Sequence, residues 1–248
     1  MNLDPTRTVR EFALEFPNAT RLFEKLGIDY CCGGGKPLQA ACADARIPLA
    51  DVLHSLKEET FLTAANTDST DFKQQSLKGL IEHIVVRHHG YVRQEIPRLQ
   101  QLLKKVVSVH GGKHPELAGI QQHFHALADE LTSHMMKEEQ VLFPYIAVME
   151  QAFQEGKPAR RPMFGTVTNP VHMMEMEHDS AGALLKEISA ASGGYTPPEN
   201  ACFSYRTLYT GLKDFEADLH QHIHLENNIL FPRAIALEEQ VNAAVNVT

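Results

Sequence analysis

Apolar residues from residue 76 onward recur three and four positions apart, as on one face of an α-helix, and no stretch alternates as a strand would. The pattern divides into four long segments, at about residues 76–109, 116–153, 168–192 and 199–242. Between them stand HGGKHPE, EGKPARRPMFG and SGGYTPPEN, which are rich in the glycine and proline that interrupt helices. Four long amphipathic helices with short connections predict an all-α fold built on a four-helix bundle.

The first 62 residues show shorter helical patterns, which Pro17, Gly27 and Pro48 interrupt. Gly27 is expected to end a helix, because a residue without Cβ readily adopts the left-handed conformation of a helix C-terminus. We predict a small helical N-terminal domain over residues 1–62, a polar linker over residues 63–75 and the bundle over residues 76–248. So small a domain buries little core by itself, which favours packing on the rest of the protein or on a second subunit, as in a homodimer.

Composition narrows the class of protein. The chain has 248 residues and a formal net charge of −8, so the phosphate backbone of a nucleic acid is an unfavourable partner. It has no long uncharged apolar run for a transmembrane helix, and its first residues lack the pattern of a secretory signal. We therefore expect no nucleic-acid partner, no membrane and a cytoplasmic location, where the four cysteines would stay thiols.

Histidine is abundant, with fourteen residues, and its spacing repeats. HMMKEEQVLFPYI, which begins at His134, recurs as HIHLENNILFPRA at His222, 88 residues later. A thinner echo, 89 residues apart, joins HIVVRHH at His83 to HMMEMEH at His172. These offsets indicate a helical hairpin used twice, and two-fold related hairpins would bring equivalent histidines together inside the bundle.

The second helix of each hairpin carries a histidine and a glutamate that suit a metal ion. His134 and Glu138 are four residues apart, which places them about 40° apart on one helix face, and His222 and Glu226 repeat the arrangement. One further histidine from the first helix of each hairpin gives four imidazoles and two carboxylates. A structural zinc site takes four ligands, commonly thiolates and imidazoles, whereas this set suits two iron or manganese ions bridged by the carboxylates.

A single histidine–glutamate pair of this kind is more often a solvated surface pair, so the metal interpretation depends on the duplication. His83 and His172 lie about 240° around the helix from the histidines six residues later, and so face elsewhere. Pro144 and Pro232 remove a backbone donor and are expected to kink or end their helices, shaping the end of the bundle. Residues expected to be solvated, or only to support ligands, are His88, His110, His114, His123, His125 and His224, while Glu177 and Asp179 are equally suited to orient a ligand ring or to be surface charges.

Cys31 and Cys32 are adjacent and are followed by three glycines. Their Cα atoms are about 3.8 Å apart across a trans peptide, which is shorter than disulfides prefer, so a bond between them would be strained and easily reduced. One interpretation is a reactive thiol pair, and the other is a tight turn with two small packed residues. Cys42 and Cys202 are isolated, and we expect both to be packed.

Several of these motifs together resemble the iron-sulfur cluster repair di-iron proteins, the RIC or YtfE/ScdA group, over almost the whole chain. The N-terminal part of the resemblance is DYCCGGG at residues 29–35. The remainder, which resembles a hemerythrin-like domain, comprises HHGYVR, SHMMKEEQVLFP, MEHDSAG and HIHLENNILFP. The chain departs from the pattern by a third glycine after the cysteines and a long loop around KPARRPMFG.

The resemblance implies an antiparallel four-helix, hemerythrin-like bundle that holds two non-haem iron ions, generally as an oxo-bridged centre. It implies the ligands His89, His134, Glu138, His178, His222 and Glu226, which decides for His89 over His83 and His88. It also implies a role in the recovery of iron-sulfur enzymes after nitrosative or oxidative stress, through donation of iron or reduction of nitric oxide.

We therefore expect a di-iron stress protein whose small ligand is nitric oxide or dioxygen and whose partners are damaged iron-sulfur proteins. Cys31 and Cys32 would be its reactive thiols. The alternative is a carrier or sensor of hemerythrin type without catalysis, although a simple carrier needs no thiols. Whether iron is donated or catalysis occurs in place stays open.

Overall fold

A computed structural model of the chain describes residues 3–16, 18–63, 72–157 and 162–245. In these ranges the chain is helical, and the β-pairing found there is an isolated bridge between Thr8 and Pro37. The predicted all-α fold is thus confirmed. The chain divides into two compact units, one of Met1–Gln75 with the segment His220–Ile229, the other of Ser76–Leu219 with Leu230–Thr248.

Short helices make up the N-terminal residues, namely α1 (Val9–Glu15), α2 (Ala19–Leu26), α3 (Leu38–Asp44) and α4 (Leu49–Thr63). A reciprocal cap begins α1, because Thr8 Oγ1 accepts the Glu11 N–H at 3.2 Å and Glu11 Oε2 accepts the Thr8 N–H at 2.8 Å. As predicted, α2 ends at Gly27, whose φ is 65°. Position 17 and residues 64–71 of the predicted linker lie outside the described residues, and the domain boundaries stay a prediction.

The N-terminal helices bury more apolar surface than the sequence analysis predicted. Their cluster includes four aromatic side chains that are at most 7% exposed, Phe12, Phe16, Phe23 and Tyr30. Phe12 and Phe16 pack with ring centroids 5.9 Å apart, and Phe23 and Tyr30 with centroids 6.5 Å apart. Large rings compensate for short helices, because each aromatic side chain removes much apolar area from water.

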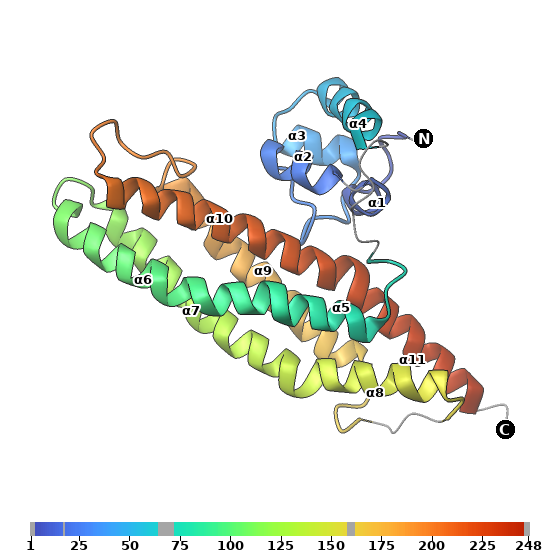
Figure 1. The fold of residues 1–248 in the computed structure, drawn as a ribbon. Coiled ribbons are helices and arrows are strands. Elements are labelled where there is room, and N and C mark those ends of the chain that lie inside the picture. Colours follow the sequence, from blue (N-terminus) through green and yellow to red (C-terminus); the bar gives the residue numbers. More distant parts are fainter. Residues whose placement is uncertain (1–2, 17, 64–71, 158–161, 246–248) are drawn as a thin grey trace. The chain divides into compact units, whose positions relative to one another are not determined.

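Four long helical runs form the bundle (Figure 1). They are α5 (Leu77–His83), η1 (Ile84–His89) and α6 (Gly90–His110); α7 (Glu116–Lys137), η2 (Glu138–Leu142) and α8 (Phe143–Gln154); α9 (Thr168–Ala191); and α10 (Phe203–Leu225), η3 (Glu226–Leu230) and α11 (Phe231–Val245). Most ends fall within a residue or two of the predicted ones. The last run differs more: α10 starts four residues later than predicted, after a turn in which Ala201 N–H donates to Pro198 O at 2.9 Å, and α11 ends three residues later than predicted.

Within the bundle, α7 packs on α6 and α9, α5 packs on α8, and α8 packs on α11. Aromatic rings join α10 to its neighbours, because Phe215 lies 5.4 Å from Phe124 of α7 and 6.3 Å from Tyr91 of α6 between ring centroids. This packing encloses the middle of the long helices, where the predicted ligands stand.

The elements labelled η are π-helical turns, and each begins or ends at a predicted ligand. His89 is the last residue of η1, Glu138 the first of η2 and Glu226 the first of η3. Phe143 N–H donates to Glu138 O, five residues back, as a π-helix requires. Single π-turns in helices are frequent at functional sites.

The prolines after η2 and η3 do not end their helices. Pro144 and Pro232 are the second residues of α8 and α11, which continue to Gln154 and Val245. A proline inside an α-helix clashes with the carbonyl four residues back and leaves it without a donor. The wider π-turn just before each proline makes room for the proline ring and shifts the carbonyl that would otherwise clash with it.

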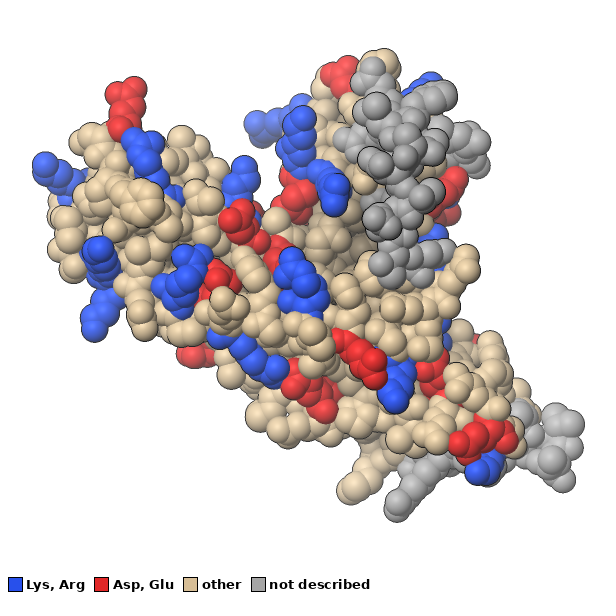
Figure 2. Space-filling model, viewed as in Figure 1, with Lys and Arg blue, Asp and Glu red and all other residues tan. Residues whose placement is uncertain are grey.

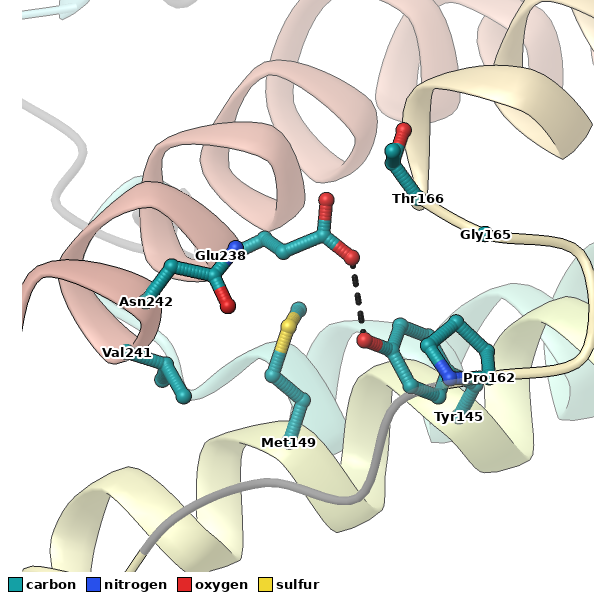
Figure 3. A pocket seen from close by; sticks show the side chains of 8 residues that line it. All are labelled: Tyr145, Met149, Pro162, Gly165, Thr166, Glu238, Val241 and Asn242. Atoms are coloured by element: carbon teal, nitrogen blue, oxygen red, sulfur yellow. Dashed lines mark hydrogen bonds between the residues drawn. The ribbon is translucent and has the colours of Figure 1, made fainter. Parts of the chain in front are cut away.

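Two glutamates bind the starts of the first helices of the two hairpins. Glu150, near the end of α8, accepts the N–H groups of Leu77 and Lys78 at 2.7 and 2.9 Å. Glu238, in α11, accepts the N–H of Val167, just before α9, at 2.9 and 3.1 Å. Glu238 also accepts the hydroxyl of Tyr145 at 2.9 Å, at the wall of a small pocket (Figure 3). These two glutamates, 150 and 238, stand at the same 88-residue offset as the histidine–glutamate pairs.

On the face shown in Figure 2, lysine and arginine side chains stand beside aspartate and glutamate side chains along the long helices, so neither sign of charge dominates that face. Among the described helices, none combines the length and the hydropathy needed to cross a bilayer.

Candidate metal centre

Six buried side chains meet in the middle of the long helices. They are at most 2% exposed, and they are the predicted ligands His89, His134, Glu138, His178, His222 and Glu226. Ionisable side chains are rarely buried so completely unless they are paired or coordinate a metal. Their burial therefore needs a compensating charge.

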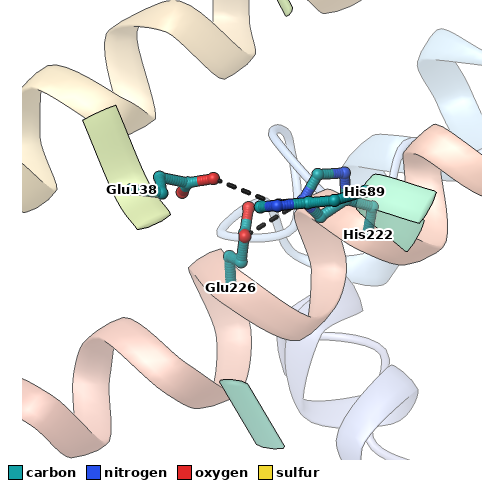
Figure 4. Close-up of side chains that lie close together, drawn as sticks. All are labelled: His89, Glu138, His222 and Glu226. Atoms are coloured by element: carbon teal, nitrogen blue, oxygen red, sulfur yellow. Dashed lines mark hydrogen bonds and ion pairs between the residues drawn. The ribbon is translucent and has the colours of Figure 1, made fainter. Parts of the chain in front are cut away.

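The ligand atoms of these residues approach one another closely. Glu138 Oε2 lies 3.4 Å from His89 Nε2 and 3.3 Å from His134 Nε2. Glu226 Oε1 lies 3.0 Å from His222 Nε2. Figure 4 shows both carboxylates directed toward the rings of His89 and His222.

Two overlapping groups of four ligands result. One consists of His89, Glu138, His222 and Glu226, and the other of His134, Glu138, His178 and Glu226. In each group the four ligand atoms lie within 4.8 Å of one another. Both carboxylates belong to both groups, whereas each histidine belongs to one.

The protonation of two imidazoles tests whether a cation fits here. His89 Nδ1 lies 2.6 Å from Glu139 Oε1, and His134 Nδ1 lies 2.9 Å from Glu177 Oε2. A carboxylate only accepts, so each Nδ1 carries a proton, and a ring without a second proton presents a lone pair at Nε2. Both Nε2 atoms face the Glu138 carboxylate, at 3.4 and 3.3 Å, and a lone pair there repels the carboxylate unless a cation, either a metal ion or a proton, lies between them. Nitrogen and oxygen donors are a suitable set for iron, so the buried group is compatible with iron binding.

The phenylalanine of each repeated Leu-Phe-Pro lies on the ring of a predicted ligand. Phe143 stacks on His89 with centroids 5.8 Å apart and an interplanar angle of 19°. Phe231 stacks on His178 at 6.1 Å and 7°. His89 and His178 are equivalent in the repeat, so each hairpin holds its first histidine with the same aromatic contact. Sequence analysis noted the repeated motif but did not assign this role.

Glu139 and Glu177 support ligands on neighbouring helices. Burial raises the pKa of each carboxyl, but hydrogen bonds from Arg93 and His89 to Glu139 outweigh it, as do those from Lys137 and His134 to Glu177, so both pKa values lie below the usual one. Glu177 was one of two residues proposed to orient a ring, and it contacts His134 rather than the adjacent His178. Sequence analysis missed Glu139, because its contact crosses to another helix.

Two of the histidines set aside earlier are buried rather than solvated. His88, 6% exposed, lies with Nδ1 3.1 Å from Asp218 Oδ2 of α10. His224, 5% exposed, lies with Nδ1 2.7 Å from Asn228 Nδ2, which donates to it. Burial lowers the pKa of His224 to about 4, so its ring is neutral and can accept. Neither residue belongs to the two groups of possible ligands.

The adjacent cysteines lie in a loop that Asp29 holds. Asp29 Oδ1 accepts the N–H groups of Cys31, Cys32 and Gly33 at 3.3, 3.1 and 2.9 Å. The two sulfur atoms are 4.0 Å apart, and Cys31 is buried whereas Cys32 is partly exposed. The neighbouring Cys32 thiol, and then burial, raise the pKa of Cys31.

The residue before this pair ties the loop to the helix segment of the same unit. Tyr30 O accepts the side-chain amide of Asn228 at 2.9 Å, and Tyr30 OH accepts that of Gln221 at 2.8 Å. A Cβ on Gly34 would lie 2.8 Å from Tyr30 O, so the turn requires a glycine there.

The other two cysteines differ from each other. Cys42 is buried, as predicted, but Cys202 is exposed, so the prediction that it is packed was wrong. Cys202 lies just before α10, and its sulfur is 3.2 Å from His110 Nε2 at the end of α6. Its place in a connection between helices explains the exposure.

Comparisons with known proteins match both parts of the chain. Residues 80–234 match the hemerythrin HHE cation binding domain, and residues 5–60 match ScdA_N, a domain of unknown function (DUF542). A probable iron-sulfur cluster repair protein of Haemophilus influenzae is 38% identical over 225 residues, which are 91% of this chain and 95% of that protein. The iron-sulfur cluster repair protein YtfE of Yersinia pseudotuberculosis is 39% identical over 226 residues, which are 90% and 94% of the two chains, and that of Yersinia pestis gives the same values.

Proposed function

Because the chain belongs to the family of iron-sulfur cluster repair proteins with a hemerythrin-like domain, we propose that it repairs iron-sulfur clusters damaged by nitrosative or oxidative stress, at a non-haem di-iron centre. Its targets are then damaged iron-sulfur proteins, and its small ligand is nitric oxide or dioxygen.

The observation that carries this proposal is the pair of overlapping ligand groups. Two groups that share both carboxylates would suit two cations, both of which Glu138 and Glu226 would help to hold. The same grouping supports a pairing of the histidines, with His89 and His222 on one ion and His134 and His178 on the other. Two carboxylates and four neutral imidazoles leave coordination positions for a small ligand.

When bound, the two iron ions would supply a position for the small ligand and exchange electrons with it. The residues of the chain have other tasks. Glu138 and Glu226 balance the charge of two close cations, and the stacked rings of Phe143 and Phe231 exclude water from one side of His89 and His178.

We also propose that Cys31 and Cys32 act as the reactive thiols of the protein. Their sulfur atoms are close enough to bind one soft metal ion together, and Cys32 reaches solvent. The homodimer stays a prediction.

The first test is a metal count on the full chain, purified under air and under argon. We expect about two iron ions per chain and an optical spectrum that changes on reduction. Fewer than about one iron per chain in both preparations, with zinc in its place, contradicts the proposal.

The second test separates repair from carriage. A purified [4Fe–4S] enzyme inactivated by nitric oxide should regain activity with the iron-loaded chain, and not with the Glu138→Ala, Glu226→Ala variant. Transfer of labelled iron, compared with and without Cys31→Ser and Cys32→Ser, distinguishes donation from catalysis in place. A reversible dioxygen adduct without oxidation, together with no recovery of the enzyme, favours a carrier.

A further inference from the structure

Two ion pairs at the surface of the bundle each end on a ligand imidazole. Arg93 donates to Glu139 Oε1 at 2.8 Å, and the same oxygen accepts the Nδ1 proton of His89 at 2.6 Å. Lys137 donates to Glu177 Oε1, and Glu177 Oε2 accepts the Nδ1 proton of His134 at 2.9 Å. The carboxylate side chains are about a quarter exposed, at 26% and 25%, and their cations are more exposed, at 50% and 42%.

Each chain of contacts fixes the direction in which an imidazole can donate its lone pair. A hydrogen bond from Nδ1 to a carboxylate selects the tautomer whose Nε2 is free to bind a metal, holds the ring in place and makes Nε2 more basic. Both Nε2 atoms already face the carboxylate of Glu138, at 3.4 and 3.3 Å. The surface pairs therefore act on the side of the ring away from the metal position.

The supported imidazoles are divided evenly between the two ligand groups. His89 belongs to the group with His222, and His134 to the group with His178. Each metal position thus receives one imidazole that a carboxylate and a cation support from outside. The two carboxylates would therefore influence both metal ions of the pair, each through one imidazole.

The fold of the hairpin does not itself require these acids. Residue 227, at the 88-residue offset from Glu139, is Asn227, and residue 88, at the 89-residue offset from Glu177, is His88. The predicted ligand residues are the same in both hairpins, whereas these positions carry a carboxylate in only one of the two. The acidic residues thus serve particular imidazoles and not the general packing of a helix pair.

We propose that Glu139, held by Arg93, and Glu177, held by Lys137, are positioning residues that slow the loss of iron and lower its reduction potential. This inference rests on the proposed di-iron function. A more basic imidazole stabilises the higher charge of the oxidised ion more than that of the reduced one, so removing the carboxylate charge raises the potential. A weaker bond from the imidazole Nε2 to the metal also lets a chelator remove the metal faster.

Isosteric variants of the full-length protein test this. Glu139→Gln, Glu177→Gln and the double variant each keep the side-chain shape and lose the charge. The matched control is Glu130→Gln, because Glu130 of α7 also reaches α9, where it accepts the hydroxyl of Ser180 at 2.9 Å, and its hydrogen bond among the described residues goes to that serine and not to a predicted ligand. Iron per chain, the rate of iron release to a chromogenic ferrous chelator and the midpoint potential of the optical change are measured for all.

Mutation of such an outer partner commonly costs about 10–100-fold in metal affinity. We therefore expect iron release about 10–100-fold faster in each glutamine variant, with a raised midpoint potential, and no change of either in Glu130→Gln. In the metal-free protein, nitrogen NMR should show a proton of His89 and His134 on Nδ1, and a weaker preference for that position in the glutamine variants, whose neutral amide oxygen is the poorer acceptor. If a glutamine variant does not fold, Arg93→Met and Lys137→Met, at more exposed side chains, should show the same changes to a smaller extent.

The outcomes distinguish this inference from the function on which it rests. A wild-type protein that holds no iron contradicts the di-iron function itself. A wild-type protein with two irons, whose glutamine variants release iron within twofold of its rate and keep its potential, overturns only the positioning role. An equal effect of Glu130→Gln overturns it as well, because the charge change would then act without contact to a ligand.

Discussion

Phe143 and Phe231 belong to the repeated motif, and each packs against the ring of a predicted ligand. Each ring is at most 2% exposed and lies flat against the first histidine of its hairpin. A ring in that position both fills the core and prevents the imidazole from turning. The repeated Leu-Phe-Pro is thus a part of the site.

At the residue scale, we expect Phe143→Ala and Phe231→Ala each to lower the free energy of unfolding of the metal-free chain by about 3–5 kcal/mol, because truncation of a buried phenylalanine leaves a cavity. Urea unfolding followed by circular dichroism measures the change. The control is Phe153→Ala, at a residue that is 45% exposed, for which about 1 kcal/mol or less is expected. Equal losses at all three positions would contradict a specific role for the two stacked rings.

The cysteines should react in an order set by exposure. Cys202 is exposed, Cys32 is partly exposed, and Cys31 and Cys42 are buried. Brief treatment of the native, reduced chain with iodoacetamide, followed by peptide mass spectrometry, should therefore label Cys202 first. Labelling of Cys42 ahead of Cys202 would show that the loop before α10 is covered in solution.

The buried thiols should also respond to pH differently from ordinary ones. Burial raises the pKa of Cys42 above 9.0, and the thiolate is the form that reacts. A raised pKa lowers the thiolate fraction at any pH below it, so alkylation of Cys42 should reach its half-maximal rate above pH 9.0. A half-maximal rate near neutral pH would contradict the apolar surroundings of this residue.

The sequence predicts the histidine–glutamate pairs from their spacing along one helix, and the choice of His89 over His83 and His88 comes from the family resemblance. It does not show residues whose role depends on contacts across helices. His134 and Glu138 share a face for reasons of helix geometry alone. By contrast, Glu139 meets His89 only once α6 and η2 are packed together. Cys202 was wrongly predicted to be packed because exposure in a loop has no periodic signal.

At the scale of elements, the helix ends depend on side chains far away in the sequence. The Glu150 carboxylate accepts the N–H of Leu77, the first residue of α5. The Glu238 carboxylate accepts the N–H of Val167, the residue just before α9. A carboxylate at a helix start satisfies backbone donors and suits the positive end of the helix dipole. The sequence predicted where these helices begin from glycine, proline and polar residues, but not which residue binds the start, because both partners lie in different helices.

We expect Glu150→Ala and Glu238→Ala each to destabilise the chain by about 1–2 kcal/mol, as for the loss of a helix cap. Chemical unfolding of the metal-free variants measures this. Glu155→Ala is the control at the end of α8, because Glu155 bonds only the side chains of Gln151 and Lys157 in the described contacts and should change stability by about 0.5 kcal/mol or less. A loss at Glu155 as large as at Glu150 would mean that charge alone, without the helix start, is responsible.

At the scale of the molecule, bound metal should contribute to the stability of the whole bundle, because its ligands come from all four long helical runs. A ligand that binds only the native state at about 1000 times its Kd adds about 4 kcal/mol. For a chain of this length that is a rise of roughly 10 °C in the melting temperature. Calorimetry measures the melting temperature before chelation, after chelation and after iron is restored. The melting temperature of the Glu138→Gln, Glu226→Gln double variant should not change on chelation.

Because three of the long helical runs contain a π-turn, the number of residues in each run determines how its two halves are oriented. Each wide turn accommodates one residue more than an α-helical turn, so the halves of a helix on either side are set at an angle that the extra residue determines. Deletion of one residue within 140–142, the last part of η2, would turn everything that follows by about 100°. Met149 would then leave the core and Glu150 would swing away from the start of α5, even though every metal ligand would still be present in the chain.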